Sequence, residues 1–452
     1  MRRRTRERRG VHRRGSSERT FYIVVVVVTC GIISSLFHHA TAVANPTSSS
    51  EAEPEPVESK KNATKRRGAR NSCDLFDLRR QQGRSRGAKL RKVVSGFESI
   101  DRHAEELGSL AQRQWLPAHC PINFTLVTQA TPERLWMLRW ICQRWEGPIV
   151  LAVYTDRSTV VEKETSCGDR VDYRIVPATK EVFARHNAYP VNRLRNLAIS
   201  RVKTSHFLMS DVDLWPDVFL LRRLQALAEA EPDVFRDPWR AIVVPAFARD
   251  VKTECSSSTA ASDSQSTYRM AECHREAEQM PSNFVELKDC IISKQCHIFD
   301  RFNMDGHGTT DYRSWLRQEN GVRDIPCFLS NRYEPYVVLA HTPDRPKFEE
   351  QFTGYGKNKI QNLVHLRYVG WKFAVLARSF LTHFPHHKSA ARIQWENKAT
   401  PPSQQQGADA ATDVDAQHRS HMDKLYRNFL DALIAVYGSP GARDDVVRIC
   451  NA

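Results

Sequence analysis

Two aspartates, Asp211 and Asp213, are the residues of this 452-residue sequence whose type and spacing best suit chemistry. They directly follow a short, mostly apolar run at 204–210 (TSHFLMS), which predicts a buried strand, and Pro216 lies just beyond them. Residues i and i+2 of a strand point the same way, so a continuing strand would present both carboxylates together. Such a pair suits a hard divalent cation, Mg²⁺ or Mn²⁺. The alternative is an Asp pair in a surface turn.

A cation held by two carboxylates needs further ligands, and the sequence offers histidines for that role. His383 ends a second apolar run (SFLTH), and His386 and His387 follow it closely. Imidazole nitrogen binds divalent transition metals, although a single histidine at a strand end more often has a structural role. Three histidines within five residues favour a metal site.

Divalent cations in proteins often hold a diphosphate, which also needs fixed positive charge and backbone N–H groups. Gly354 and Gly356 open a predicted helix, whose N-terminus would offer N–H groups to an anion. Glycines at a helix start are, however, more often simple turn residues. The basic side chains that could supply the positive charge are Arg193, Arg195, Lys357 and Lys359.

The elements that position these residues alternate between strands and helices. This alternation predicts an α/β fold with a mostly parallel sheet, and ligands bind at the carboxyl ends of the strands in such sheets. The other predicted strands are 122–129, 149–154, 172–176, 241–247, 336–340, 371–376 and 380–384. The predicted helices begin at Pro132, cover 190–202, run from Gly354 to about residue 369, and cover 422–437.

The distribution of charge argues against nucleic-acid binding. The chain has a net charge of +15, but residues 1–100 hold 22 Lys/Arg and 9 Asp/Glu, whereas the remainder holds 45 and 43. The predicted folded body is therefore close to neutral. A nucleic-acid-binding domain would carry its positive charge on the folded surface.

The N-terminus predicts a membrane anchor. Residues 1–20 carry nine Arg and two Glu, and residues 21–37 (FYIVVVVVTCGIISSLF) carry no charge. This run is near the lower limit for a membrane-spanning helix, and the arginines on one flank place the N-terminus in the cytosol. A cleaved signal peptide is the alternative, with 42–44 (AVA) as its cleavage site. The short span favours an early secretory membrane.

The remaining segments follow from composition. We expect a largely disordered stem at 38–117, a catalytic body at 118–396 with a flexible Ser-rich insert at 254–283, a disordered linker at 397–421 and a C-terminal helical segment at 422–452. Ten of the eleven cysteines follow the apolar run, and an oxidising compartment permits disulfides among them. Asn62 and Asn123 are in glycosylation sequons.

Several blocks of the body resemble glycosyltransferase family 49, the group that contains the LARGE-type enzymes and a β-1,4-glucuronyltransferase acting on dystroglycan. They occur in the family's order over about 265 residues. The blocks are TLVTQATPERLWMLRWICQRWEGPIVLAVYTD (125–156), YPVNRLRNLAISRVKTSHFLMSDVDLWP (189–216), HGTTDYRSW (307–315), YEPYVV (333–338), EEQFTGYGKNKIQNLVHL (349–366) and FAVLARSFLTHFPHHKS (373–389).

The resemblance implies a GT-A glycosyltransferase fold, which is a Rossmann-like mixed sheet flanked by helices, behind an N-terminal signal anchor. It implies that Asp211 and Asp213 bind Mn²⁺ on the diphosphate of a UDP-sugar, with His383 as the third protein ligand and His386 as the runner-up. The implied uridine pocket contains Thr128, Gln129 and Arg134. The implied contacts to the nucleotide or donor sugar are Asn192, Arg195 and Asn196, and those closing over the diphosphate are Gly356, Asn358 and Lys359.

The resemblance also implies a single-pass type II protein of the Golgi membrane that transfers glucuronic acid, with inversion, to a glycan or glycoprotein acceptor. Inversion needs a carboxylate to deprotonate the acceptor hydroxyl, and the candidates are Glu334, Asp311 and Glu350. Three alternatives remain open. They are transfer of another sugar such as xylose or an N-acetylhexosamine, a non-catalytic glycan-binding protein, and a nucleotide-sugar hydrolase.

Overall fold

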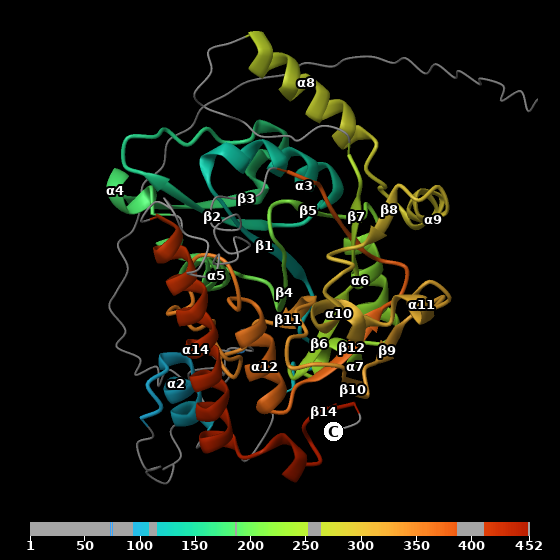
Figure 1. Ribbon diagram of the computed structural model, residues 1–452. Helices are drawn as coiled ribbons and strands as arrows, with labels where there is room; N and C mark the ends of the chain where they lie inside the picture. Colours follow the sequence, from blue (N-terminus) through green and yellow to red (C-terminus); the bar gives the residue numbers. More distant parts are fainter. Residues whose placement is uncertain are drawn as a thin grey trace, which may run out of the picture. The chain divides into compact units, whose positions relative to one another are not determined.

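The computed structural model of the protein is shown in Figure 1. It describes Cys73, Leu75, 94–107, 115–185, 188–251, 264–386 and 411–450, all within one compact unit, Gly68–Ala452; for 264–270, 411–417 and residue 442 it describes the backbone alone. The predicted basic tail, anchor, Asn62 and His387 lie outside the described residues. None of the described helices combines the length and apolar character that a bilayer crossing requires.

The main sheet has eight strands and is mixed, so the predicted α/β class is confirmed. In spatial order the strands are β3 (Val171–Ala178), β2 (Ile149–Asp156), β1 (Phe124–Ala130), β4 (His206–Met209), β11 (Tyr336–Ala340), β6 (Arg240–Val244), β12 (Lys372–Leu376) and β9 (Val322–Asp324). The first four strands in this order are parallel to one another. β11 runs antiparallel to both of its neighbours, β12 is parallel to β6, and β9 is antiparallel to β12.

Two smaller sheets accompany it. One has the order β5 (Leu214–Pro216), β13 (Leu381–His383), β7 (Ala246–Arg249) and β8 (Cys296–Ile298), and the other pairs β10 (Cys327–Phe328) with β14 (Arg448–Ile449). The single strand predicted at 241–247 is therefore wrong. Pro245 has no N–H to donate to a ladder, and the chain leaves the main sheet there and enters the second one.

The helices cover the main sheet and extend beyond it (Figure 1). They are α2 (Glu98–Leu107), η1 (Pro132–Met137), α3 (Leu138–Arg144), η2 (Thr165–Arg170), α4 (Lys180–Phe183), α5 (Val191–Ile199), α6 (Leu220–Ala230), α7 (Asp233–Arg236), α8 (Ser264–Glu278), α9 (Phe284–Ile292), α10 (Met304–His307), η4 (Gly308–Thr310), α11 (Tyr312–Trp315), α12 (Ile360–Tyr368), α14 (Ala411–Tyr437) and η6 (Pro440–Ala442).

Three predicted segments differ from the observed ones. Residues 264–278 of the predicted flexible insert form α8, and the C-terminal helix begins at Ala411, inside the predicted linker. The helix predicted from Gly354 begins only at Ile360, because Gly354, Gly356 and Lys357 have φ of 65°, 94° and 60° and cannot be helical. In each case the local composition did not indicate the residue at which the helix begins.

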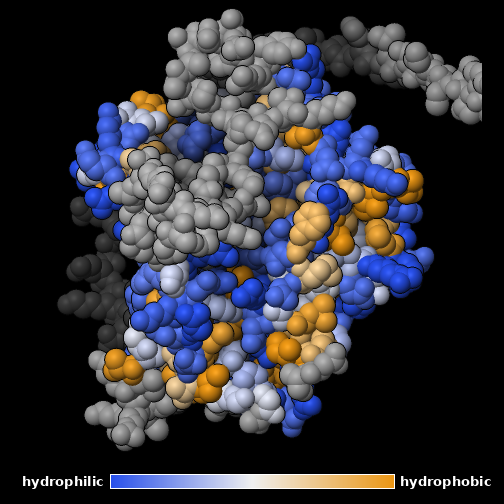
Figure 2. Space-filling model, in the orientation of Figure 1, coloured by the Kyte–Doolittle hydropathy of each residue, from blue (hydrophilic) through white to orange (hydrophobic). Residues whose placement is uncertain are grey.

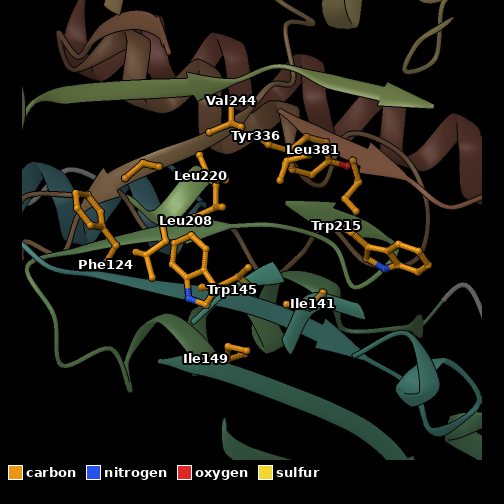
Figure 3. Close-up of a cluster of buried hydrophobic side chains, with 14 of the residues drawn as sticks. Phe124, Ile141, Trp145, Ile149, Leu208, Trp215, Leu220, Val244, Tyr336 and Leu381 are labelled. Carbon is orange, nitrogen blue, oxygen red and sulfur yellow. The ribbon is translucent and has the colours of Figure 1, made fainter. Parts of the chain in front are cut away.

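Two hydrophobic clusters fill the faces of the main sheet. Alternation along β4 places Leu208 in one cluster and Phe207 and Met209 in the other. In the first cluster, Trp145 and Leu220 pack beside Leu208 (Figure 3). Fully burying a side chain such as leucine contributes about 1.5–3 kcal/mol. The two faces therefore hold the central strands, and with them the residues that follow β4, in fixed positions.

A third cluster joins α2, α12 and α14. The rings of Phe97 and Phe429 lie 5.1 Å apart edge-to-face, and Ile100 is completely buried in this cluster. Ser99 N donates to Glu349 Oε2 at 3.0 Å, which fixes α2 to the loop before α12. The end of the predicted stem is thus part of the folded unit. Figure 1 shows these three helices beside one another.

Disulfides link cysteines of the described chain whose sequence separations range from 6 to 123 residues. The bonded pairs are Cys73–Cys120, Cys142–Cys167, Cys290–Cys296 and Cys327–Cys450. Cys273 is also disulfide-bonded. Asn123, the second sequon, is exposed at the start of β1.

The buried His206 on β4 predicts a pH dependence of stability. Burial lowers its pKa to about 4 from 6.5, and the ring lies between Phe235 O (2.9 Å) and Ser205 Oγ (2.9 Å). Because the unfolded chain takes up the proton first as pH falls, the free energy of unfolding should fall from pH 6.5 towards pH 4, by about 3 kcal/mol. Urea unfolding at a series of pH values measures this change.

The control for this prediction is His206→Gln, which keeps an N–H for Phe235 O but does not titrate. Other buried histidines remain in both proteins, so the difference between the two curves isolates His206. An equally steep decline in the variant would show that His206 does not cause it.

Candidate active site

A cavity of about 1030 Å³ opens at the edge of the main sheet where β1 and β4 end and β11 begins. Residues from both sheets line it, including Gln129 at the end of β1, Asp211 after β4, Tyr336 at the start of β11 and His383 at the end of β13. The carboxyl ends of parallel strands are where open α/β sheets bind ligands. The cavity therefore lies where the sequence predicted a site.

Asp211 accepts hydrogen bonds from three elements. Its Oδ1 accepts from Gln129 Nε2 at 2.7 Å and from Arg195 Nη2 at 3.0 Å. Its Oδ2 accepts from the Tyr336 hydroxyl at 2.8 Å, and Lys359 Nζ lies 3.9 Å away. Both carboxylate oxygens thus accept hydrogen bonds from the protein, one of them from the cation Arg195, and a second cation, Lys359, lies nearby.

The charges around Asp211 settle its protonation. Burial would raise the pKa of Asp211, but Arg195 and Lys359 outweigh burial and hold the pKa below its usual value. Burial also lowers the pKa of Lys359, which lies with Nζ 3.7 Å from the centre of the Tyr336 ring. Burial, followed by the charge of Asp211, raises the pKa of Tyr336 well above 10. Tyr336 therefore remains a hydrogen-bond donor to Asp211.

Asp213 faces a different set of groups. His386 Nε2 lies 2.6 Å from Asp213 Oδ2, Arg134 Nη1 donates to the same oxygen at 3.4 Å, and His383 Nε2 lies 3.9 Å from it. Burial would raise the pKa of Asp213, but the hydrogen bond and charge of His386, with help from His383 and Arg134, hold it well below its usual value. Asp213 is an anion at any physiological pH.

The tautomer of His386 follows from its two neighbours. Arg134 has no acceptor, so Arg134 Nη2, 3.2 Å from His386 Nδ1, must donate to that nitrogen when the ring is neutral. Nε2 then carries the proton and donates to Asp213. A cation beside Asp213 would displace this proton, because a histidine binds a metal through an unprotonated nitrogen.

Asp213, His383 and His386 form a group that fits a divalent cation. One ligand atom from each lies within 4.8 Å of the other two. One carboxylate oxygen and two imidazole nitrogens suit Mn²⁺ or Zn²⁺, and Mn²⁺ accepts the harder oxygen ligands of a phosphate as well. His386 is the nearer of the two histidines to Asp213, although the resemblance had implied His383 first. Both histidines line the cavity.

The sequence argument for Asp211 and Asp213 is corrected in one respect. The two residues lie in a turn between β4 and β5 and not in a continuing strand, so strand alternation does not set the direction of their side chains. Asp213 faces the histidines, whereas Asp211 faces Gln129, Arg195 and Tyr336. The two carboxylates are therefore divided between a metal-binding group and a hydrogen-bond network.

The loop 354–359 forms the other wall beside Asp211. Asn358 Oδ1 accepts from Arg195 Nη1 at 3.1 Å, and Asn358 Nδ2 donates to Gly354 O at 3.1 Å. Lys357 Nζ lies 3.3 Å from Asp423 of α14. Gly356, Asn358 and Lys359 of this loop line the cavity.

The predicted nucleotide contacts divide into two groups. Gln129, Arg134 and Arg195 line the cavity, whereas Thr128, Asn192 and Asn196 do not. Asn192 is fully buried and donates to Glu349 O at 2.9 Å, and Asn196 donates to Phe348 O at 2.8 Å. Asn192 and Asn196 thus hold the backbone of the 348–350 segment. The side chain of Thr128 is completely buried, because neighbours in a strand face opposite sides.

The three predicted base candidates are also separated. Glu334 lines the cavity and is partly buried, and burial raises its pKa against the opposing charge of Lys359. Asp311 is exposed and caps α11 by accepting from Ser314 N at 3.2 Å. Glu350 is exposed and accepts from Asn196 Nδ2 at 3.0 Å. Of these three residues, Glu334 lines the cavity, whereas Asp311 and Glu350 do not.

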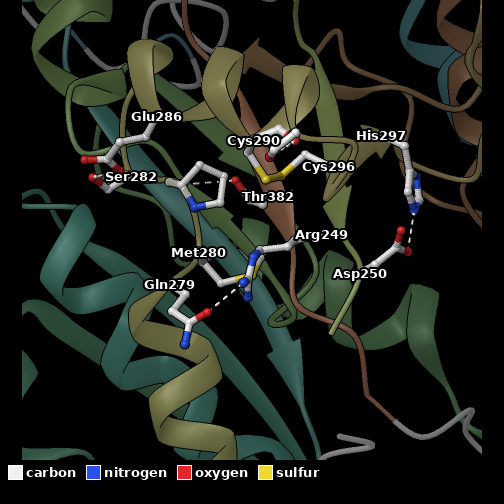
Figure 4. The surroundings of a disulfide bond; sticks show 12 residues. Arg249, Asp250, Gln279, Met280, Ser282, Glu286, Cys290, Cys296, His297 and Thr382 are labelled. Atoms are coloured by element: carbon white, nitrogen blue, oxygen red, sulfur yellow. Dashed lines mark hydrogen bonds and ion pairs between the residues drawn. A yellow bond between two sulfur atoms is a disulfide. The ribbon is translucent and has the colours of Figure 1, made fainter. Parts of the chain in front are cut away.

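The sequence did not identify some of the residues that line the cavity. Tyr336 begins a strand at the same sheet edge as Asp211, and that placement was the signal for it. The wall made by β7 and β8 had no sequence signal. There, Arg249 donates to Gln279 Oε1 at 2.7 Å and His297 Nε2 lies 3.1 Å from Asp250 Oδ1, beside the Cys290–Cys296 disulfide (Figure 4).

The sequence matches a protein-family model described as "Glycosyl-transferase for dystroglycan" over residues 156–407. It is 31% identical to the rat (Rattus norvegicus) xylosyl- and glucuronyltransferase LARGE2 over 280 residues, which are 60% of this chain and 36% of the rat protein. It is 26% identical to human (Homo sapiens) xylosyl- and glucuronyltransferase LARGE1 over 287 residues, or 61% of this chain and 33% of the human protein. The chain spans about a third of the length of these relatives.

Two solved structures show distant similarity to this chain. S. aureus TarS 1–349 aligns with a TM-score of 0.31 and 9% identity over 70% of this chain and 72% of that chain. GalNAc-T7 with UDP, GalNAc and Mn²⁺ aligns with a TM-score of 0.36 and 9% identity over 70% of this chain and 50% of that chain.

The cluster around Asp213 generates a prediction about metal binding. His386→Ala and His383→Ala should each weaken Mn²⁺ binding in the presence of UDP by at least about tenfold, because each removes one nitrogen ligand. Calorimetric titration of the full-length protein with Mn²⁺ measures this affinity. Asp311→Asn is the control, since Asp311 is outside the cavity. Wild-type affinity in both histidine variants would exclude this group as the metal site.

Proposed function

The chain belongs to the family of glycosyltransferases for dystroglycan, and from this membership we propose that it transfers a sugar from a UDP-sugar to a glycan acceptor with the help of Mn²⁺. The observation that supports the proposal best is the content of one cavity. A candidate cation-binding group, several basic side chains and the partly buried carboxyl group of Glu334 converge there. The basic residues nearest the two aspartates include Arg134, Arg195 and Lys359.

In this proposal the metal site is Asp213, His383 and His386. A Mn²⁺ ion held there supplies a Lewis acid for the diphosphate of the leaving UDP. Arg134 lies next to this group, and Lys359 lies on the opposite side, beside Asp211. Both side chains supply fixed positive charge for a diphosphate placed between them. Asp211 holds Arg195, Tyr336 and Lys359 in place and contributes to the metal site indirectly.

Glu334 is the proposed general base. Its carboxylate accepts the proton of the acceptor hydroxyl while the acceptor oxygen forms a bond to the anomeric carbon of the donor sugar. The bond from that carbon to the β-phosphate oxygen breaks, and UDP leaves with the electron pair. The pKa of Glu334 is raised by burial, which brings the carboxylate closer to the basicity that this task requires.

The finer parts of the proposal come from the resemblance and the relatives. We assign the fold to the GT-A type and the protein to the Golgi membrane as a type II protein. Glucuronic acid is the proposed donor sugar. Xylose is the second candidate, because the relatives are named as both xylosyl- and glucuronyltransferases. A non-catalytic glycan-binding role is less favoured, because such a role has no need for a metal group and a buried base together.

The proposal predicts the outcome of a donor screen. We expect Mn²⁺-dependent UDP release by the full-length protein from UDP-glucuronic acid in a panel that includes UDP-xylose and UDP-N-acetylhexosamines. Asp213→Asn should abolish this release, because it removes the anionic ligand of the ion. Release from UDP-xylose alone would contradict glucuronic acid as the donor. Full activity of Asp213→Asn would contradict the metal site.

The assignment of the base has its own test. Glu334→Gln should lower kcat for transfer by about 10²- to 10⁴-fold, because glutamine cannot accept the proton. Affinity for UDP with Mn²⁺, measured by calorimetry, should change little. Glu350→Gln is the matched control, since Glu350 is exposed and outside the cavity. A loss of activity in Glu350→Gln and none in Glu334→Gln would reverse the assignment.

A further inference from the structure

One aromatic side chain lies on the wall of the cavity and still faces water. Phe302 lines the cavity and is 88% exposed. Single exposed hydrophobic residues are common on protein surfaces and need no explanation by themselves. The position of Phe302 is what distinguishes it, because an exposed ring inside a ligand cavity is available to whatever enters.

The local backbone holds this ring in the open. Asp300 has φ of 49°, in the left-handed region, and Asn303 N donates to Asp300 O at 2.8 Å. Asn303 Nδ2 donates to Asp300 Oδ2 at 3.1 Å and closes the turn a second time. The guanidinium of Arg301 lies 5.0 Å from the centre of the Phe302 ring. The turn therefore presents Arg301 and Phe302 away from the core.

The order of strands places this turn on the side of Asp211 opposite to Gln129, one of the expected uridine contacts. Gln129 ends β1 on one side of β4, and Glu334 precedes β11 on the other. The turn belongs to the side of Glu334, because Asn303 Nδ2 donates to Glu334 Oε1 at 3.4 Å and Glu334 N donates to Gly306 O at 2.9 Å. The aromatic ring and the proposed base are thus parts of one connected wall.

The chemistry of this wall suits a sugar ring. One face of a pyranose is lined by C–H groups and packs on the face of an aromatic ring, whereas its hydroxyls need polar partners around the rim. The wall offers Arg301, Asn303 and Arg332 as such partners, and all three line the cavity. The wall carries carboxylates as well as guanidinium groups, so its charge does not call for a charged sugar.

We infer that the terminal sugar of the acceptor stacks on Phe302, with one hydroxyl directed at Glu334. This inference rests on the proposed function and adds the place and the means of acceptor binding. Phe302 is a binding residue and takes no part in bond formation. Its removal should therefore affect the KM for the acceptor and leave the KM for the UDP-sugar nearly constant.

The experiment measures transfer by the full-length protein to nitrophenyl β-glycosides of xylose, glucuronic acid, N-acetylglucosamine and galactose. Phe302→Ala should raise the acceptor KM by about tenfold, because it removes an aromatic contact and its buried area. Phe302→Tyr keeps the ring and should restore an acceptor KM within about twofold of the wild-type value.

Phe219→Ala is the matched control. Phe219 is also exposed, at 40%, and lies under a guanidinium, with Arg223 Cζ 5.2 Å from the ring centre, but it does not line the cavity. An acceptor KM that is the same in Phe302→Ala and wild type overturns the inference, and so does UDP release without transfer to any glycoside. Absence of Mn²⁺-dependent UDP release by the wild-type protein would instead overturn the proposed function itself.

Discussion

The ion pair between Arg195 and Asp211 is the interaction on which the geometry of the cavity depends. Arg195 comes from α5 and is only 3% exposed, and it reaches both Asp211 after β4 and Asn358 in the loop before α12. A buried arginine without its carboxylate would be severely destabilising, so the two groups hold each other in place. The helix α5, the turn after β4 and the loop before α12 are thereby joined at one point. Tyr336 adds β11 to the same network and anchors it in the hydrophobic core (Figure 3).

The Asp-x-Asp spacing suggested that Asp211 and Asp213 bind a cation together, but in the structure the two residues contact different groups. Asp211 organises protein donors, and Asp213 faces the histidines. The separation depends on the second sheet, because β13 brings His383 alongside Leu214 of β5, directly after Asp213. Pro245 lies between β6 and β7, where the chain passes from the main sheet to the second sheet.

Figure 2 shows mainly hydrophilic residues on the face drawn, with separate groups of hydrophobic residues among them.

The sequence predicted the elements of the central sheet well, because buried strands such as 336–340 are short apolar runs with clear ends. It also predicted that Asp211, His383 and Glu334 belong to a site. It could not predict how Asp211 and Asp213 divide, because the direction of a side chain in a turn depends on tertiary partners. The same applies to Asn192 and Asn196, whose polar side chains are satisfied by backbone carbonyls of the 348–350 segment. The signal for α8 was hidden because polar, Ser-rich composition is typical of loops.

The disulfide between Cys327 and Cys450 closes a covalent ring of the chain that contains Glu334, the 354–359 loop, His383 and His386. A protease that cuts this ring once, at any peptide bond between the two cysteines, leaves both fragments attached to each other. Such a nicked protein would migrate as one species in gel electrophoresis without reductant and as two with it. Limited proteolysis between Cys327 and Cys450 would thus pass unnoticed unless the sample is reduced, and a preparation judged intact by its apparent mass can contain cleaved molecules.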